Sequence, residues 1–386
     1  MKKFLLLFTL AFLLAGCAAQ VSAPADTQPE ETRLQTAPTE ASLPEIEPPE
    51  TEPVDPVEAL LGSMTLEEKV GQIFLARCPG EQAAEDLLVY RLGGYVLFGS
   101  DFDGQTPAAL RDTLRQWQSA SRIPLLIAVD EEGGTVCRVS SHPEFRSEPF
   151  RSPRELYARG GMDEVLDTET EKAALLWDLG INTVLGPVCD VSQQWQAFMF
   201  KRSLGESPEV TGEFAAGAVQ RYASFGVGSV LKHFPGYGNN ADTHTGIAVD
   251  KRSLEVFEAA DLIPFASGIR AGSGGVMVSH TIVQALDSEM PASLSPAVHN
   301  YLRETMGFTG AILTDDLDMA AITEQYGAGE AAVMAVLAGN SLICTGSYQD
   351  QYTAVLEAVS GGRIPLEQLD SAVRTVLQWK HDLGLL

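Results

Sequence analysis

From residue 58 onward, short apolar, β-branched runs alternate with longer amphipathic stretches, and this alternation restricts the fold more than any other feature. Near-continuous apolar runs are typical of parallel strands that are covered on both faces. The predicted strands are 72–77, 94–99, 125–130, 181–188, 227–234, 275–280, 310–316 and 341–346. The clearest helices between them are predicted over 106–120, 162–179, 208–225, 254–271 and 319–338. This pattern predicts an α/β fold, a single TIM-like (β/α)8 barrel, with an open doubly wound sheet as the alternative.

Charged and imidazole side chains gather where the apolar runs stop. These strand ends are residues 130–134, 187–190, 232–236, 279–280 and 314–316. In a (β/α)8 barrel the chemistry lies at the carboxyl ends of the strands, so an active site is predicted at this face. For Asp190 and Asp316 taken singly, a helix N-cap role is the alternative.

The strongest local signal follows the fifth predicted strand. Lys232 and His233 close this strand, a turn rich in proline and glycine follows, and Asp242 and His244 stand two residues apart beyond it. A carboxylate beside an imidazole orients the ring and raises its basicity, which suits a proton donor and acceptor near neutral pH. An Asx-turn next to an exposed histidine is the alternative interpretation.

These segments resemble a known family. The run Lys-His-Phe-Pro-Gly at 232–236, followed by Asp242-x-His244, is similar to the signature of glycoside hydrolase family 3 in its NagZ-like β-N-acetylglucosaminidase branch. Further segments match in order at 127–134 with Arg138, at 182–191, at 202–205 and at 312–319. The resemblance spans roughly residues 58–386. It implies a TIM-like barrel, a single catalytic domain and a glycosidase, a β-N-acetylhexosaminidase that hydrolyses terminal N-acetyl-β-D-glucosamine residues.

The resemblance also implies a role for individual residues. Asp315 matches the catalytic nucleophile of a retaining mechanism, His244 matches the general acid/base, and Asp242 matches its dyad partner. The positions that match sugar-binding residues are Asp130, Arg138, Arg202, Lys232 and His233. Neighbouring Asp316 is the second candidate for the nucleophile. No metal and no cofactor is implied, and muropeptides of the cell wall or chitooligosaccharides are the expected substrates.

The first 57 residues have a different character. Two lysines precede an apolar run at 4–14, which is too short to span a bilayer of about 30 Å, and the sequence then reads Leu-Ala-Gly-Cys17. This pattern resembles a bacterial lipobox, which predicts a signal peptide over 1–17 and lipid attachment at Cys17. An ordinary cleavage site with a chance cysteine is the alternative. Residues 18–57 are rich in proline and acidic residues, so a disordered linker is predicted there. The expected location is extracytoplasmic, with the lipid anchor in the cell membrane.

Charge and cysteine content narrow the function further. The net charge is −26, which argues against general nucleic-acid binding because that needs a basic surface. A carbohydrate partner and a monomer are expected instead. Outside the lipobox the cysteines are scattered at Cys78, Cys137, Cys189 and Cys344, which leaves both two disulfides and four thiols open.

Three other functions stay open at this point. The first is a phosphorylase that passes the sugar to phosphate instead of water. The second is a metal-dependent hydrolase on the same barrel, whose candidate ligands are His233, Asp242, His244, His280 and Asp315. The third is a non-catalytic solute-binding lipoprotein.

Aromatic residues supply two smaller expectations. Trp177 and Trp379 fall on predicted helix faces and are expected in the core. Trp195 and Phe198 stand close to Arg202, and they are candidates for a wall on which a sugar ring stacks.

Overall fold

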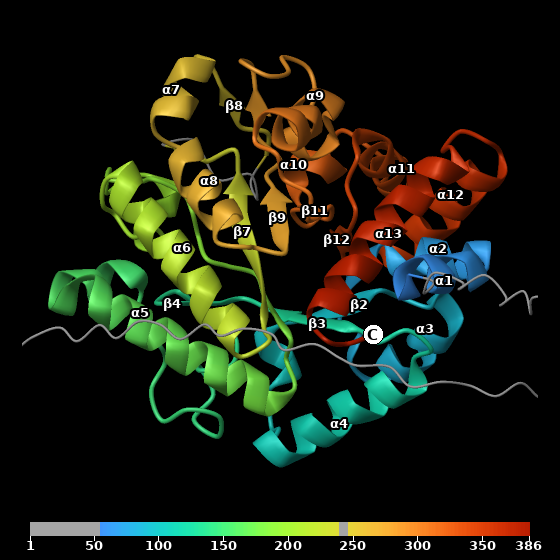
Figure 1. Ribbon diagram of the computed structural model, residues 1–386, viewed down its shortest axis with the longest axis horizontal. Helices are drawn as coiled ribbons and strands as arrows, with labels where there is room; N and C mark the ends of the chain where they lie inside the picture. The colour runs from blue at the N-terminus through green and yellow to red at the C-terminus, as the bar shows by residue number, and fades with distance from the viewer. Residues whose placement is uncertain (1–54, 239–245) are drawn as a thin grey trace, which may run out of the picture. The chain divides into compact units, whose positions relative to one another are not determined.

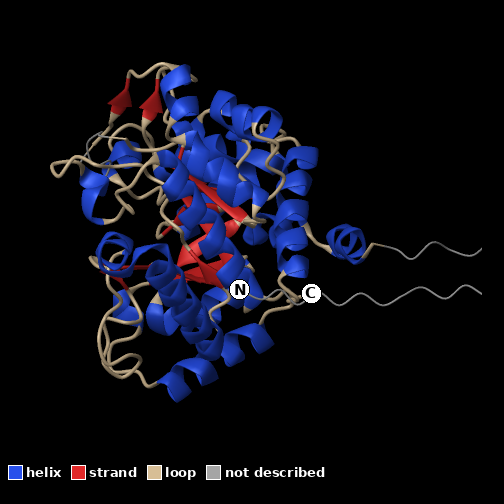
Figure 2. Ribbon diagram, turned by 60° about the vertical axis from the view of Figure 1, so that its left-hand side comes forward, coloured by secondary structure: helices blue, strands red, loops and turns tan. Residues whose placement is uncertain are grey.

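The structure is a computed structural model that describes residues 55–238 and 246–386, all within a compact unit over Pro53–Leu386. Its centre is a sheet of eight parallel strands with helices around it (Figures 1 and 2). The strands are β1 (Phe74–Arg77), β2 (Gly94–Leu97), β3 (Leu126–Val129), β6 (Thr183–Val184), β7 (Gly228–Phe234), β9 (Gly275–Val278), β11 (Ala311–Thr314) and β12 (Ile343–Thr345). All eight predicted strands are therefore present, although most are shorter than predicted.

The sheet closes almost completely on itself. The strand order is β11-β9-β7-β6-β3-β2-β1-β12, and an isolated parallel bridge between Leu313 and Leu342 brings the two outer strands together. The backbone N–H of Thr314 also donates to the carbonyl oxygen of Leu342 at 3.2 Å. The predicted (β/α)8 barrel is thus confirmed, and the open doubly wound sheet is wrong.

Helices lie on the outside of this barrel. They are α1 (Pro56–Ser63), α2 (Leu66–Gln72), α3 (Ala83–Tyr90), α4 (Pro107–Ala120), α5 (Pro153–Leu179), α6 (Pro208–Ser224), α7 (Leu254–Ala259), α8 (Leu262–Arg270), α9 (Pro296–Asn300), α10 (Ala320–Thr323), α11 (Ala328–Ala338), α12 (Tyr348–Ser360) and α13 (Leu366–Asp382). Two predicted helices are each divided in two, 254–271 into α7 and α8 and 319–338 into α10 and α11. Among the described residues, no helix is long and apolar enough to cross a membrane.

Three of the long helices begin in the same way. Thr106, Ser152 and Ser207 each precede a proline at the first helical position of α4, α5 and α6. Each hydroxyl oxygen accepts a hydrogen bond from the backbone N–H three residues later, at 3.2–3.3 Å. This N-cap satisfies a donor that the helix itself leaves free, and proline there loses no helical hydrogen bond. Gly161 has a non-helical backbone and divides α5 into two helices, so the predicted helix over 162–179 matches the second, and the cap at Ser152 begins a first helix that was not predicted.

Helix α13 closes the amino ends of the strands, where it lies beside α1 and α2 (Figure 1). The indole of Trp379 is only 5 % exposed. A Cβ atom on Gly274 would lie 2.0 Å from its Nε1, so only glycine fits at that position. Trp379 is therefore a core residue, as predicted. The same prediction is wrong for Trp177, which is 62 % exposed because it lies on the solvent-facing side of α5.

The opposite face carries the elements that build the site. After β3 the chain folds into a short antiparallel hairpin, β4 (Glu131–Gly133) with β5 (Val136–Cys137). After β6 a loop leads to the 3₁₀ turn η3 (Phe198–Lys201). Two-residue strands β8 (Val249–Asp250) and β10 (Ile282–Val283) pair in parallel above β7 and β9.

Candidate active site

A cavity of about 500 Å³ lies at the carboxyl ends of the barrel strands. The predicted site residues that line it are Asp130, Arg138, Arg202, Lys232, His233 and Asp315. Residues from β3, the β4–β5 hairpin, η3, β7 and β11 thus meet as the barrel topology requires. Asp242, His244 and Cys17 lie outside the described residues, so the structure says nothing of their positions.

Lys232 is the centre of a buried charge cluster. Its Nζ lies 2.5 Å from Oδ1 of Asp130 and 2.6 Å from Oε1 of Glu132. Arg202 binds the same Glu132 with two parallel hydrogen bonds, from Nε at 2.9 Å and from Nη2 at 2.7 Å. Such bidentate pairs fix orientation as well as charge. The four side chains therefore form one connected cluster, of which Asp130, Arg202 and Lys232 line the cavity.

The pKa values show how this cluster holds its charges. Burial alone would raise the pKa of Glu132, but the positive charges of Arg202 and Lys232 outweigh burial and hold that pKa well below its usual value. Burial alone would lower the pKa of Lys232, but the carboxylates of Asp130 and Glu132 hold it above its usual value. Both groups are consequently charged at neutral pH.

His233 is held at both ring nitrogens. Its Nδ1 lies 2.8 Å from Oδ2 of Asp190, and its Nε2 lies 3.2 Å from Nη2 of Arg202. Because a carboxylate can only accept and a guanidinium can only donate, this network assigns the ring proton to Nδ1. The neutral imidazole therefore orients Arg202.

Asp190 anchors the loop after β7 as well as the imidazole. Its oxygens accept from the backbone N–H of His233 at 3.2 Å and of Tyr237 at 2.7 Å. The N-cap alternative for Asp190 is wrong, because no helix begins beside it. Sequence reasoning gave no site role to Asp190 or Glu132, although both stand at strand ends that it had singled out.

The carboxylates after β11 form a chain of hydrogen bonds. Oδ1 of Asp315 accepts from the backbone N–H of Asp316 at 2.9 Å, and Oδ1 of Asp316 accepts from that of Asp318 at 3.0 Å. Burial raises the pKa of Asp316 to about 6. The N-cap alternative for Asp316 is wrong, because α10 starts later and Met319 is its N-cap residue. Both Asp315 and Asp316 line the cavity, so both remain candidates for the nucleophile.

The imidazole of His280 contacts the backbone of the segment that carries Asp315 and Asp316. Its Nε2 lies 2.8 Å from the carbonyl oxygen of Asp316, and its Nδ1 lies 2.7 Å from Oγ of Ser293. Within residues 55–238 and 246–386, no group of three or more His, Cys, Asp or Glu side chains is placed to hold a metal ion. His280 and His233 each have hydrogen-bond partners at both ring nitrogens.

Two further arginines line the cavity, Arg138, which the sequence analysis had singled out, and Arg77, which it had not. The guanidinium of Arg77, at the end of β1, lies 4.3 Å from the ring centre of Phe98. Nε of Arg138 is buried and has no hydrogen-bond partner among the described residues.

Trp195 and Phe198 were the two candidates for stacking on a sugar ring, and only Phe198 lines the cavity. Phe198 lines the cavity and packs edge-to-face against Tyr237, with ring centres 5.7 Å apart. Trp195 is 74 % exposed and is not among the cavity-lining residues. Phe198 is therefore the better candidate for contact with a sugar ring in this cavity.

The cysteines outside the lipobox are free thiols, so the two possible disulfides are absent from the described part of the chain. Cys344 lines the cavity, and burial raises its pKa well above the usual value. This thiol is consequently protonated and poorly nucleophilic at neutral pH.

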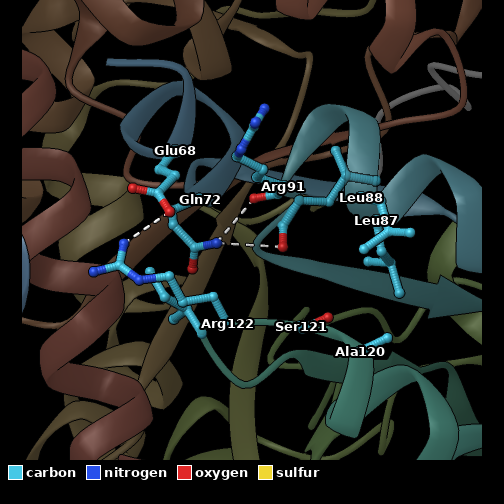
Figure 3. A pocket seen from close by; sticks show the side chains of 10 residues that line it. Glu68, Gln72, Leu87, Leu88, Arg91, Ala120, Ser121 and Arg122 are labelled. Carbon is cyan, nitrogen blue, oxygen red and sulfur yellow. Dashed lines mark hydrogen bonds and ion pairs between the residues drawn. The ribbon is translucent and has the colours of Figure 1, made fainter. Parts of the chain in front are cut away.

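A smaller cavity of about 150 Å³ lies at the amino-end side of the barrel (Figure 3). Its polar side chains are already paired with each other and with the backbone. Arg122 forms an ion pair with Glu68 at 2.7 Å, and Nε2 of Gln72 donates to the carbonyl oxygens of Arg91 and Leu92 at 2.9 and 3.3 Å. None of the predicted site residues lines it. The larger cavity at the carboxyl ends is therefore the candidate active site.

A barrel with a carboxylate-lined cavity at this face has the layout of a barrel enzyme. The glycosyl hydrolase family 3 N-terminal domain matches residues 65–379. The chain therefore belongs to glycoside hydrolase family 3, and the predicted family and enzyme class, a glycosidase of the β-N-acetylhexosaminidase branch, are confirmed.

Individual relatives agree with this family membership. A β-hexosaminidase of Xylella fastidiosa (strain M23) is 32 % identical over 295 residues, which are 75 % of this chain and 86 % of the relative. The β-hexosaminidase LpqI of Mycobacterium tuberculosis is 32 % identical over 307 residues, 75 % of this chain and 76 % of the relative. A family 3 β-N-acetylglucosaminidase structure from Paenibacillus sp. has a TM-score of 0.78 at 29 % identity, covering 84 % of this chain and 63 % of that one.

Proposed function

We propose that this enzyme hydrolyses terminal, non-reducing N-acetyl-β-D-glucosamine residues of glycosides, with cell-wall muropeptides and chitooligosaccharides as the substrate classes. The observation that carries the proposal is the position of Asp315, at the end of β11, in the same cavity as the Lys232 cluster. A glycosidase needs a carboxylate at the anomeric carbon and donors that hold the sugar, and the carboxylate and N–H groups that line this cavity are suited to these roles.

The proposed mechanism is retaining. The Asp315 carboxylate attacks the anomeric carbon, the glycosidic bond breaks, and a covalent glycosyl-enzyme forms. His244, oriented by Asp242, donates a proton to the departing oxygen and then accepts one from the attacking water. Two inversions at the anomeric carbon restore the β configuration.

The cavity wall would bind the sugar through its donors. Lys232, Arg202 and Arg138 carry N–H groups suited to hydroxyl and N-acetyl oxygens, and Asp130 accepts from hydroxyl groups. Asp130, Glu132 and Asp190 fix these donors before the substrate arrives, so little rearrangement is needed on binding. His233 then acts as a positioning group through Arg202.

The test is hydrolysis of an aryl N-acetyl-β-glucosaminide by the full chain, followed by NMR of the first-formed sugar. We expect the β anomer as the first product and the same rate with and without inorganic phosphate. An α anomer would exclude the retaining mechanism. A sugar phosphate as the product would show a phosphorylase instead.

His244 is tested by comparing leaving groups. His244→Ala should lower kcat/KM about 10²–10⁴-fold for an alkyl glycoside, whose alkoxide needs the proton. An aryl glycoside, whose phenolate departs almost unaided, should be affected far less. Equal losses with both substrates would remove His244 from the role of proton donor.

We also propose that the enzyme is a membrane-anchored lipoprotein outside the cytoplasm, modified at Cys17. The lipobox resemblance and the acidic, proline-rich linker after it support this proposal. Metabolic labelling with a fatty acid should mark the wild type and not Cys17→Ala. Equal labelling of both proteins would contradict it.

A further inference from the structure

A buried network that the proposed mechanism does not use adjoins the charge cluster around Lys232. It is built on α5, which packs against both α6 and β4 (Figure 1). Nζ of Lys172 in α5 lies 2.7 Å from Oε1 of Glu169, one turn earlier in the same helix. The hydroxyl of Tyr222 in α6 donates to Oε2 of Glu169 at 2.6 Å. The side chains of Lys172 and Glu169 are only 1 % and 3 % exposed, so this ion pair belongs to the protein interior.

The ammonium group of Lys172 also reaches the hairpin that follows β3. It donates to the backbone carbonyl oxygen of Glu132 at 2.7 Å. The carboxylate of Glu132 binds Arg202 through two hydrogen bonds and lies 2.6 Å from Nζ of Lys232. Lys172 therefore holds the backbone of Glu132, while Arg202 and Lys232 contact its side chain.

Little space surrounds the contact between Lys172 and Glu132. The cavity that these two residues line together with Glu169 and Tyr222 has a volume of about 10 Å³. One water molecule needs about that much room, so a sugar does not fit there. Because a close-packed interior transmits displacements, a change at residue 172 should move Glu132 and not be absorbed by empty space. The network can thus act on a substrate only through the hairpin.

We propose that Lys172 is a positioning residue of the active site, which fixes the backbone of Glu132 and thereby the carboxylate that holds Arg202 and Lys232 for the sugar. The inference rests on the proposed function, in which these two cations donate to oxygens of the N-acetylglucosamine unit. Placement matters there because a shift of about 1 Å in a positioning group can cost about 10²-fold in rate. Glu169 has a different role, since it compensates the buried charge of Lys172.

The experiment compares two variants that both lose the buried ion pair and differ only at residue 172. Glu169→Gln keeps the hydrogen bond from Lys172 to Glu132, and its amide oxygen can still accept from Nζ. Glu169→Gln/Lys172→Met loses the hydrogen bond to Glu132 but leaves no buried charge behind. The full chain is assayed for kcat and KM with an aryl N-acetyl-β-glucosaminide, and urea unfolding gives the stability. KM does not depend on the folded fraction, so a purely structural effect leaves it unchanged.

We expect Glu169→Gln to keep the KM of the wild type and the double variant to raise KM about tenfold, the effect of weakening one hydrogen bond from a charged donor. Glu169→Gln should nevertheless be the less stable of the two, because it leaves a buried cation uncompensated. Glu169→Gln/Lys172→Gln guards against a double variant that does not fold. Its two amides can bond to each other, but glutamine is one atom shorter than lysine and does not reach Glu132, so KM should rise there as well.

A KM equal to that of the wild type in the double variants would overturn the inference, and so would an equal rise of KM in Glu169→Gln. Arg202→Met, which removes a proposed sugar donor, separates this failure from that of the proposed function. If Arg202→Met raises KM and the double variants do not, the proposed function stands without this inference. If neither raises KM, or if the wild type does not cleave the glycoside, the proposed role of the cluster fails and this inference fails with it.

Discussion

The two ends of the barrel each contain a fully buried lysine, in opposite electrostatic settings. At the carboxyl ends, Nζ of Lys232 lies 2.5 and 2.6 Å from the carboxylates of Asp130 and Glu132. At the amino ends, Nζ of Lys380 in α13 donates to the amide oxygen of Gln72 at 2.7 Å, its one hydrogen-bond partner in the described residues. The pKa of Lys232 lies above its usual value, whereas burial lowers the pKa of Lys380 to about 7.

This contrast separates a buried charge that carboxylates compensate from one that only a neutral amide contacts. Burying an ion costs free energy unless opposite charges and hydrogen bonds compensate it. The catalytic face supplies that compensation with carboxylates, and thereby presents a fixed cation to a ligand. At the amino-end face, the hydrogen-bond partner of Lys380 among the described residues is the neutral side-chain amide of Gln72. Substitutions at the two faces should therefore affect different quantities.

The largest expected effect is on activity at the catalytic face. Asp315→Asn removes the proposed nucleophile and should lower kcat/KM about 10⁴-fold or more, for aryl and alkyl glycosides alike. Its free energy of unfolding should not fall, since the change removes one of several neighbouring negative charges. Steady-state kinetics and urea unfolding measure both quantities. More than a hundredth of the wild-type activity would assign the nucleophile elsewhere, with Asp316 the next candidate.

The second effect is on stability at the same face. Lys232→Met removes the cation between Asp130 and Glu132, and breaking a buried ion pair from one side costs about 3–5 kcal/mol. We expect a loss of that size in the free energy of unfolding, measured by urea denaturation at pH 7. A loss below about 1 kcal/mol would mean that Arg202 alone compensates the two carboxylates.

The same substitution at the other face should act in the opposite direction. Lys380→Met removes a buried, weakly compensated cation and should raise the free energy of unfolding at pH 7 by about 1 kcal/mol, even though Gln72 loses its donor. Enzymatic activity should equal that of the wild type. A destabilised Lys380→Met protein would show that the contact with Gln72 outweighs the burial of the charge.

Lys380 also predicts a dependence of stability on pH. The pKa of Lys380 is about 7 in the folded state, against about 10.4 in an unfolded chain. Between these values the unfolded state binds more protons, so stability rises with pH. Relative to Lys380→Met, the wild type should gain up to about 1.4 kcal/mol per pH unit across this window. Unfolding of both proteins at pH 7, 8 and 9 measures it, and parallel stability curves would contradict it.

The two faces also differ in how much of them the sequence predicts. The strand pattern predicted the barrel, and the ends of the apolar runs predicted the side chains that meet in the cavity. The sequence could not show that Glu132 joins Lys232 and Arg202, because three adjacent acidic residues leave open which carboxylate turns inward. It could not show that Asp190 holds the imidazole of His233 either, because that contact joins residues 43 positions apart.

At the amino-end face the sequence predicts less of the structure. Lys380 stands near the end of an amphipathic helix, where a lysine is normally exposed. Its burial follows from the way α13 packs beneath the strands, which is a property of tertiary structure. The same limit explains the error at Trp177, because periodicity alone does not say which side of a long helix faces the barrel.

The different exposure of the tryptophans predicts how the intrinsic fluorescence of the protein behaves. Trp117 and Trp379 are 9 % and 5 % exposed, whereas Trp177 and Trp195 are 62 % and 74 % exposed. Intrinsic fluorescence should therefore have a blue-shifted component shielded from acrylamide and a red-shifted component open to it. Loss of the shielded component reports the opening of the core, including the amino-end packing around Trp379. The exposed component contains Trp177 of α5 and Trp195 of the loop that leads to η3, so an unlabelled sample carries separate optical signals for the core and for the surface.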